Sequence, residues 1–160
     1  MLVEVHRART RLDSVFAMTR LLPLDDLEIR AHWARYLCVL TSGFLEESLR
    51  LILEEFGKKM AHPSVARYMN SSLQGISGVN DERLRQLIGS FSDEWRTAYE
   101  RDLQDRYKAH LDSLVANRHQ IAHGRWVGIS IQRITEYYRS VIAVIEWVHD
   151  SCCGLHRPRH

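Results

Sequence analysis

Apolar side chains recur every three or four positions along most of this chain, and that period is typical of α-helices. The longest such segment ends near Gly57 and carries a wide apolar stripe, formed by Trp33, Leu37, Leu40, Phe44, Leu45, Leu49, Ile52, Leu53 and Phe56. Asp25 is a good N-cap for it, because Glu28 follows three residues later as in a capping box. A helix this long spans a small domain, so we expect it to form the spine of a bundle.

Residues that start or stop helices delimit the shorter segments in the first half of the chain. Pro23 closes a first amphipathic helix, and Pro63 opens a short helix that runs to Met69. Residues 71–78 are polar and glycine-containing, which predicts a loop. Asn80 then caps another short helix.

Two further helices follow in the second half of the chain. The first begins at Ser92 or Asp93, both of which are good N-caps, and Gly124 is its natural C-terminal stop. The second begins near Ser130, and the residues expected to face inward from it are Ile131, Ile134, Tyr138, Val141, Val144, Ile145 and Val148.

The sequence shows no internal repeat, no strand-like alternation and no glycine-rich phosphate loop. The pattern therefore predicts an all-α fold, a helical bundle of about five to six helices with two long helices. We expect one domain, with an N-terminal helix over residues 1–24 and the main helical unit over residues 25–153. Residues 154–160, which include His156 and His160, are expected to form a flexible polar tail.

The composition is that of an ordinary globular protein: of 160 residues, 45% are apolar and 26% are charged, and the net charge is +2. So small a charge does not by itself indicate a nucleic-acid-binding protein. Cys38, Cys152 and Cys153 form no disulfide framework, because adjacent cysteines pair only with strain, and this favours a reducing compartment. No apolar run is long enough to cross a membrane and no signal core begins the chain, so we expect a cytoplasmic protein without membrane association.

The candidate chemistry lies at the expected end of the helix that Gly124 closes. Arg118 is followed directly by His119, and His123 comes five residues after the arginine. Arginine binds phosphate through a planar fork of donors, and histidine exchanges protons near neutral pH. Together they are the minimum set of groups for phosphodiester chemistry without a metal.

This run, and the segments around it, resemble the HEPN superfamily (higher eukaryotes and prokaryotes nucleotide-binding domains), and within it the RiboL-PSP-type HEPN family. The Arg118-to-His123 spacing is similar to the superfamily's R-x4-6-H signature. Further matching segments are residues 42–48 (SGFLEES), 87–91 (LIGSF) with Trp95, 116–124 and the pair Tyr137-Tyr138. The resemblance covers about residues 30 to 150.

The resemblance implies a small helical bundle that acts as a metal-independent endoribonuclease, in a toxin–antitoxin, phage-defence or RNA-processing setting. It implies a homodimer in which two motifs face each other across a two-fold axis, RNA as substrate, and an antitoxin or defence-system protein as a further partner. By position, Arg118 and His123 are the catalytic pair and His119 the polar residue beside the arginine. Glu46 and Asn117 are candidate supporting residues. No cofactor and no metal are expected.

The helical spacing gives an independent reason to expect two chains. Positions five apart on an α-helix differ by about 140° in direction, so Arg118 and His123 do not share one face. Two such helices at a symmetric interface can pool their side chains into one groove.

Other interpretations of the same residues stay open. The cationic side chains suit the negative end of a helix macrodipole, and His119 with His123 could begin a zinc site, although no further ligands with suitable spacing follow. Arg125 is a candidate RNA-binding residue that could hold phosphate while Trp126 stacks a base, but a solvated arginine beside a core tryptophan is the commoner arrangement. The alternatives to an enzyme are a non-catalytic HEPN module that binds RNA or a protein partner, and a purely structural helical dimer.

Overall fold

The computed structural model describes residues 1–154, and over these residues it contains helices and no strands. The helices are α1 (Val3–Ala17), the 3-10 turn η1 (Met18–Leu21), α2 (Leu27–Met60), α3 (Pro63–Leu73), α4 (Asp81–Gly89), α5 (Asp93–Tyr99), the π-helical turn η2 (Glu100–Gln104), α6 (Asp105–Ala122) and α7 (Ile131–Cys152). Since α5, η2 and α6 are continuous, the described chain forms six helical rods, of which α2, α7 and the rod over residues 93–122 are long. The predicted all-α bundle is confirmed, while most of the expected tail, residues 155–160, lies outside the described part.

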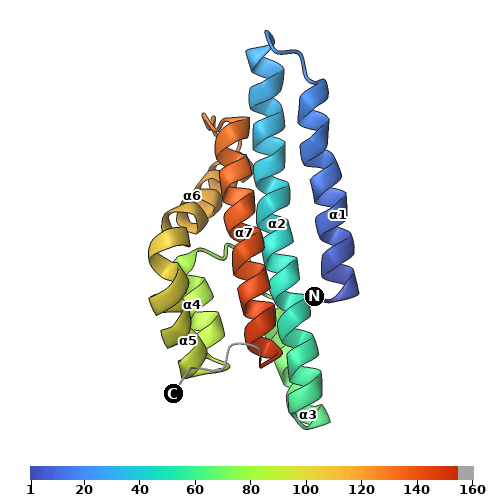
Figure 1. The fold of residues 1–160 in the computed structure, drawn as a ribbon, viewed down its shortest axis with the longest axis vertical. Coiled ribbons are helices and arrows are strands. Elements are labelled where there is room, and N and C mark those ends of the chain that lie inside the picture. The colour runs from blue at the N-terminus through green and yellow to red at the C-terminus, as the bar shows by residue number, and fades with distance from the viewer. Residues whose placement is uncertain (155–160) are drawn as a thin grey trace.

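Helix α2 is the spine of the bundle, as its length predicts. Figure 1 shows α1 alongside one flank of α2 and α7 alongside the other, with α4, α5 and α6 beyond α7. Helix α3 folds back against the far end of α2. Helix α1 is tied to α7 by two polar contacts, because Arg9 reaches Glu146 at 2.7 Å and the Tyr138 hydroxyl donates to Asp13 at 2.7 Å.

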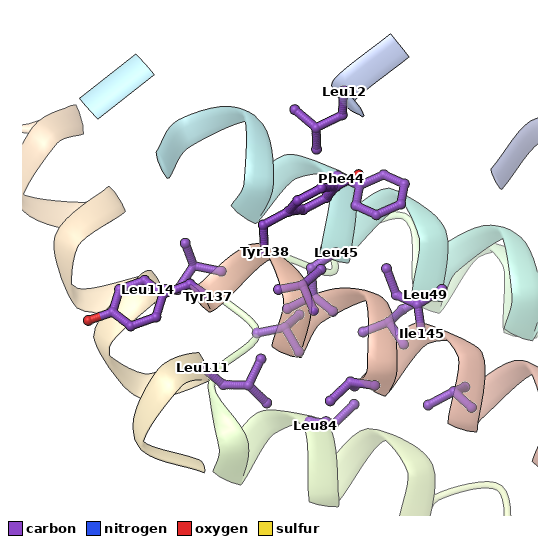
Figure 2. Packing of buried hydrophobic residues seen from close by; sticks show 14 of the residues in the cluster. Leu12, Phe44, Leu45, Leu49, Leu84, Leu111, Leu114, Tyr137, Tyr138 and Ile145 are labelled. Atoms are coloured by element: carbon purple, nitrogen blue, oxygen red, sulfur yellow. The ribbon is translucent and has the colours of Figure 1, made fainter. Parts of the chain in front are cut away.

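The core lies where α2, α7 and α6 meet. Figure 2 shows Phe44, Leu45 and Leu49 of α2 facing Tyr138 and Ile145 of α7, while α1, α4 and α6 contribute the labelled side chains of Leu12, Leu84, Leu111 and Leu114. Phe16 stacks on Tyr138 with ring centroids 4.4 Å apart, which seals the core on the α1 side. Burial of these apolar side chains is the main force that holds the helices together.

Most helix boundaries follow the capping residues that the sequence predicts. The side chains of Asn80, Ser92 and Ser130 each accept a backbone N–H at the start of α4, α5 and α7. The expected cap of α2 is wrong by one residue: Asp26, not Asp25, accepts the N–H of Ile29 at 2.9 Å, so Glu28 is not the partner in a capping box.

Two helices also run further than expected. Helix α2 continues through Gly57 and ends at Met60. Gly57 does not stop the helix, and the absence of a side chain there leaves room for Met69. An added Cβ at Gly57 would lie 2.8 Å from the Met69 methyl carbon, so this glycine serves close packing of α3 on α2. Helix α3 continues to Leu73, because Leu73 and Ala66 are buried on the same side of the helix and this burial stabilises the additional turn.

A buried carboxylate fixes the second layer of helices. Asp81 at the start of α4 is fully buried and accepts hydrogen bonds from the Tyr99 hydroxyl and the Gln104 amide, both at 2.9 Å. Lys108 of α6 lies 3.6 Å from the same carboxylate. One side chain therefore joins α4, α5, the π-helical turn and α6, and so positions the helix that carries the Arg-His run.

Candidate functional site

The Arg-His run occupies the last turn and the C-cap of α6. Arg118 and His119 are helical, His123 is the C-cap residue, and Gly124 follows with φ +68°. The N–H of Gly124 donates to the carbonyl of Ile121 at 3.0 Å, and the N–H of Arg125 donates to that of Gln120 at 2.9 Å. These two bonds form a Schellman motif, which confirms Gly124 as the helix stop and fixes the direction of the chain after it.

The structure brings the two histidines together. The rings of His119 and His123 meet edge to face, with centroids 4.4 Å apart, and both side chains are exposed. No contact joins either ring to Arg118, as expected for positions that point in different directions. A single chain therefore presents an imidazole pair and, separately, a guanidinium.

The guanidinium of Arg118 is unengaged within the part of the chain that the structure describes. The side chain is half-buried, yet it makes no hydrogen bond, ion pair or ring contact with residues 1–154. Asn117, a candidate supporting residue, is half-buried and likewise makes no side-chain contact there. Both side chains are thus available to a ligand or to a second chain.

Within one chain, the Glu46 side chain contacts a loop and not the Arg-His run. Its carboxylate accepts the backbone N–H of Gly78 at 2.7 Å and, more weakly, the Ser42 hydroxyl at 3.4 Å. A Cβ on Gly78 would lie 3.8 Å from Val115, so this loop rests on α6 one turn before Arg118. In one chain, Glu46 therefore braces the loop that supports α6 and makes no contact with Arg118, His119 or His123.

Trp126 is not the core tryptophan that is the commoner of the two interpretations of the sequence, because 70% of it is exposed. The guanidinium carbon of Arg35, on α2, lies 4.0 Å from the centre of its ring, a cation–π contact. Arg35 had no signal in the sequence, because its proximity to the motif depends on how α2 packs against the segment after α6. Arg125 is solvent-exposed, as expected, and its guanidinium donates to the Gln120 side chain at 3.2 Å.

The segments that meet here lack negative side chains. No aspartate or glutamate occurs between residues 113 and 135, a stretch that holds three arginines and two histidines. The same is true of residues 29–45 of α2, which contain Arg30, His32 and Arg35. Because 20 of the 160 residues are acidic, two such stretches side by side make this end of the molecule locally cationic despite the small net charge.

Other groups near the motif do not extend the site. Among residues 1–154, no group of three or more His, Cys, Asp or Glu side chains is placed to hold a metal ion. Cys38 is buried 3.8 Å from the carbonyl oxygen of Leu114, and burial raises the pKa of its thiol to about 12, so it is not a nucleophile at neutral pH. None of the helices in this part of the chain is long and apolar enough to span a membrane.

The fold and the site together define a class of small helical domains: an all-α bundle with an arginine and a histidine pair at the exposed end of one core helix. Comparison with known protein families identifies this class. The RiboL-PSP-HEPN family model matches residues 10–154, and the chain belongs to that family. No curated protein and no solved structure matches the chain significantly. The resemblance found in the sequence is thus confirmed, and the chain is a HEPN-type domain.

Proposed function

We propose that this HEPN domain is a metal-independent endoribonuclease whose active site forms between two copies of the chain. The observation that carries the proposal is the arrangement at the end of α6, where an unengaged Arg118 and the exposed pair His119 and His123 lie in a stretch without carboxylates. Such a stretch attracts a polyanion, and it supplies a proton acceptor and, separately, a permanent cation.

The reaction follows from the chemistry of these groups. His123 takes the proton from a ribose 2′-hydroxyl, whose oxygen then attacks the adjacent phosphorus. Arg118 stabilises the charge that builds on the phosphoryl oxygens. The bond from phosphorus to the 5′-oxygen breaks, and that oxygen leaves with a proton from a protonated imidazole of the cluster. The products are a 2′,3′-cyclic phosphate and a 5′-hydroxyl, so DNA, which lacks the 2′-hydroxyl, is not cut.

Two features support a homodimer. The first is the separation of Arg118 from the histidine pair within one chain, which a second motif across a two-fold axis would complete. The second is the exposed apolar face of α2, where Ile29, Tyr36 and Val39 are 44%, 49% and 39% exposed. Arg35 lies between this face and Trp126, so the face borders the motif directly. A dimer that covers it would bring two motifs near one groove.

The activity is tested with purified protein and single-stranded RNA in excess EDTA. We expect the parent to cut, and Arg118→Ala and His123→Ala to lose at least about a hundredfold in rate, the usual scale for a proton-transfer group or an electrostatic clamp. Arg106→Ala on the same helix and His6→Ala on α1 are matched controls, because both residues are exposed and distant in sequence from the motif.

Undiminished cutting by the His123→Ala variant contradicts the proposed mechanism. Binding of RNA without cutting by the parent would instead favour the non-catalytic HEPN module. In a toxin or defence setting, expression of the parent but not of His123→Ala should arrest the growth of a bacterial host, and a partner protein that restores growth would be the antitoxin.

A further inference from the structure

Trp126 stands out as a large aromatic side chain that the fold holds in solvent. In the segment between α6 and α7, Val127 and Ile129 are 8% and 6% exposed and fill the core, while Trp126 is 70% exposed. Burial alternates along residues 126–129, with Trp126 and Gly128 exposed and Val127 and Ile129 buried, so Trp126 faces away from the core that its neighbours fill. The exposure of Trp126 therefore follows from the burial of its neighbours in this segment.

The position of the indole is fixed from both ends of this segment. On one side, the Schellman bonds hold Gly124 and Arg125 against the end of α6. On the other, the Ser130 side chain caps α7 by accepting the N–H of Arg133 at 3.1 Å. Arg35 covers part of the ring from the α2 side at 4.0 Å, and most of the remaining ring surface is open.

The surroundings of Trp126 indicate what it binds. Arg35, like Arg118, forms no ion pair with any residue of the described chain, and the stretches that hold these arginines contain no carboxylate. An indole supported by an arginine offers a π-surface to a planar base, while the nearby cations attract its phosphates. A protein partner with an ordinary mixed surface would need neither the flat ring nor cations of a single sign, so RNA is the occupant that the observations favour.

We propose that Trp126, backed by Arg35, is the stacking platform for an unpaired nucleobase of RNA whose phosphate lies at Arg118 and His123. This assignment rests on the proposed function, since it places the base beside the phosphate that is cut. It gives the substrate class: single-stranded RNA or loops, because a base inside a duplex has no free face to offer.

The test measures binding of the intact protein to a single-stranded RNA whose 2′-hydroxyls are methylated, so that it cannot be cut. Trp126→Ala should weaken this binding about tenfold, and Trp126→Phe should retain most of it, because a smaller aromatic ring still stacks. Duplex RNA should bind weakly to all three proteins and change little. Tyr68→Ala is the matched control, because Tyr68 is 75% exposed on α3 and outside the motif.

A second readout separates this proposal from the proposed function. With unmodified RNA, Trp126→Ala should raise KM about tenfold and leave kcat within a few-fold of the parent. Equal RNA affinity for parent and Trp126→Ala overturns the platform, even if the parent cuts RNA. Loss of binding in Trp126→Ala sustains it, even if the parent does not cut. A fall in oligomeric state with unchanged RNA affinity would show that Trp126 contacts protein, and it also overturns the platform.

Discussion

Arg118 and Arg50 show two uses of the same side chain in one molecule. Arg50 holds two carboxylates on α2, Glu47 at 2.5 Å and Glu54 at 2.6 Å, and its hydrogen bonds to them raise its pKa above the ordinary value. Its charge is neutralised within the fold. Arg118 has no such partner among the described residues, and its charge therefore remains available to an incoming phosphate.

Glu46 shows how tertiary contacts decide the role of a side chain within one chain. Its place in the long helix made it a candidate acid for the site, but its carboxylate is engaged by the Gly78 backbone. A resemblance by position indicates which residue types recur in a family at a given place. The hydrogen bond of Glu46 could not be predicted in this way, because its donor lies in a loop 32 residues further along the chain. Arg118, His119 and His123 could be singled out from local sequence because they lie within one turn and a half of helix. Trp126 and Arg35 could not, because their contact is tertiary.

Gly124 offers a direct test at this scale. A residue with a Cβ is strained at φ +68°, so Gly124→Ala should lower the free energy of unfolding by about 1 kcal/mol. It should also slow RNA cleavage, because His123 precedes this turn and Trp126 follows it. Urea unfolding and initial cleavage rates measure the two effects.

Gly128→Ala is the matched control for this change. Gly128 has no positive φ, and neither glycine has a neighbour within 4 Å of an added Cβ, so the two differ in backbone conformation alone. Equal stability of the two variants would show that the turn at Gly124 does not depend on glycine.

At the scale of helices, periodicity and capping predict most of the fold. Ser130 and Gly124 mark boundaries correctly because each is the only good capping residue at its place, and Asn80 caps α4 although Asp81, which follows it, could also cap. Asp25 and Asp26 are adjacent and equally able to cap, so the choice between them depends on where the preceding 3-10 turn ends. The π-helical turn at Glu100–Gln104 has no signal in the sequence, since it accommodates the packing of Gln104 and Tyr99 around Asp81.

The junction at Asp81 should therefore dominate the stability of the second helical layer. Asp81→Ala removes the acceptor of the buried hydrogen bond from Tyr99 and of the part-buried one from Gln104, and it leaves the Tyr99 hydroxyl without a partner. We expect a loss of about 3 kcal/mol in the free energy of unfolding, measured by urea denaturation.

Asp93→Ala makes the same chemical change at the start of α5, where the side chain is 82% exposed, and should cost less than about 1 kcal/mol. Similar losses for the two variants would mean that Asp81 does not hold the helices together.

At the scale of the whole molecule, the account depends on the face of α2 that the bundle leaves uncovered. The sequence predicts that α2 is amphipathic, with one apolar stripe that faces the core of the bundle. Packing of that stripe does not explain why the apolar residues Ile29, Tyr36 and Val39 remain at the surface. Figure 1 shows α1 and α7 on two flanks of α2, which leaves part of the helix surface uncovered by the bundle. A second copy of the chain that covers this face would explain why these apolar residues are exposed in one chain, and it would also complete the site.

Tyr36→Glu tests the role of this face. Burying a charge in an apolar interface without a partner is unfavourable, so the variant should be monomeric by analytical ultracentrifugation, folded by circular dichroism and inactive against RNA. Tyr68→Glu, on α3, should leave both mass and activity unchanged. A Tyr36→Glu monomer that still cuts RNA would place the whole active site within one chain.

The most direct measurement of the central claim is subunit complementation. Arg118→Ala and His123→Ala proteins, each inactive alone, are mixed so that their subunits exchange, and cleavage of single-stranded RNA is followed in EDTA. A mixed dimer keeps one arginine and one histidine on opposite chains, so the account predicts that activity returns to a substantial fraction of the parent's. A mixture that exchanges subunits yet stays inactive would contradict a site shared between two chains.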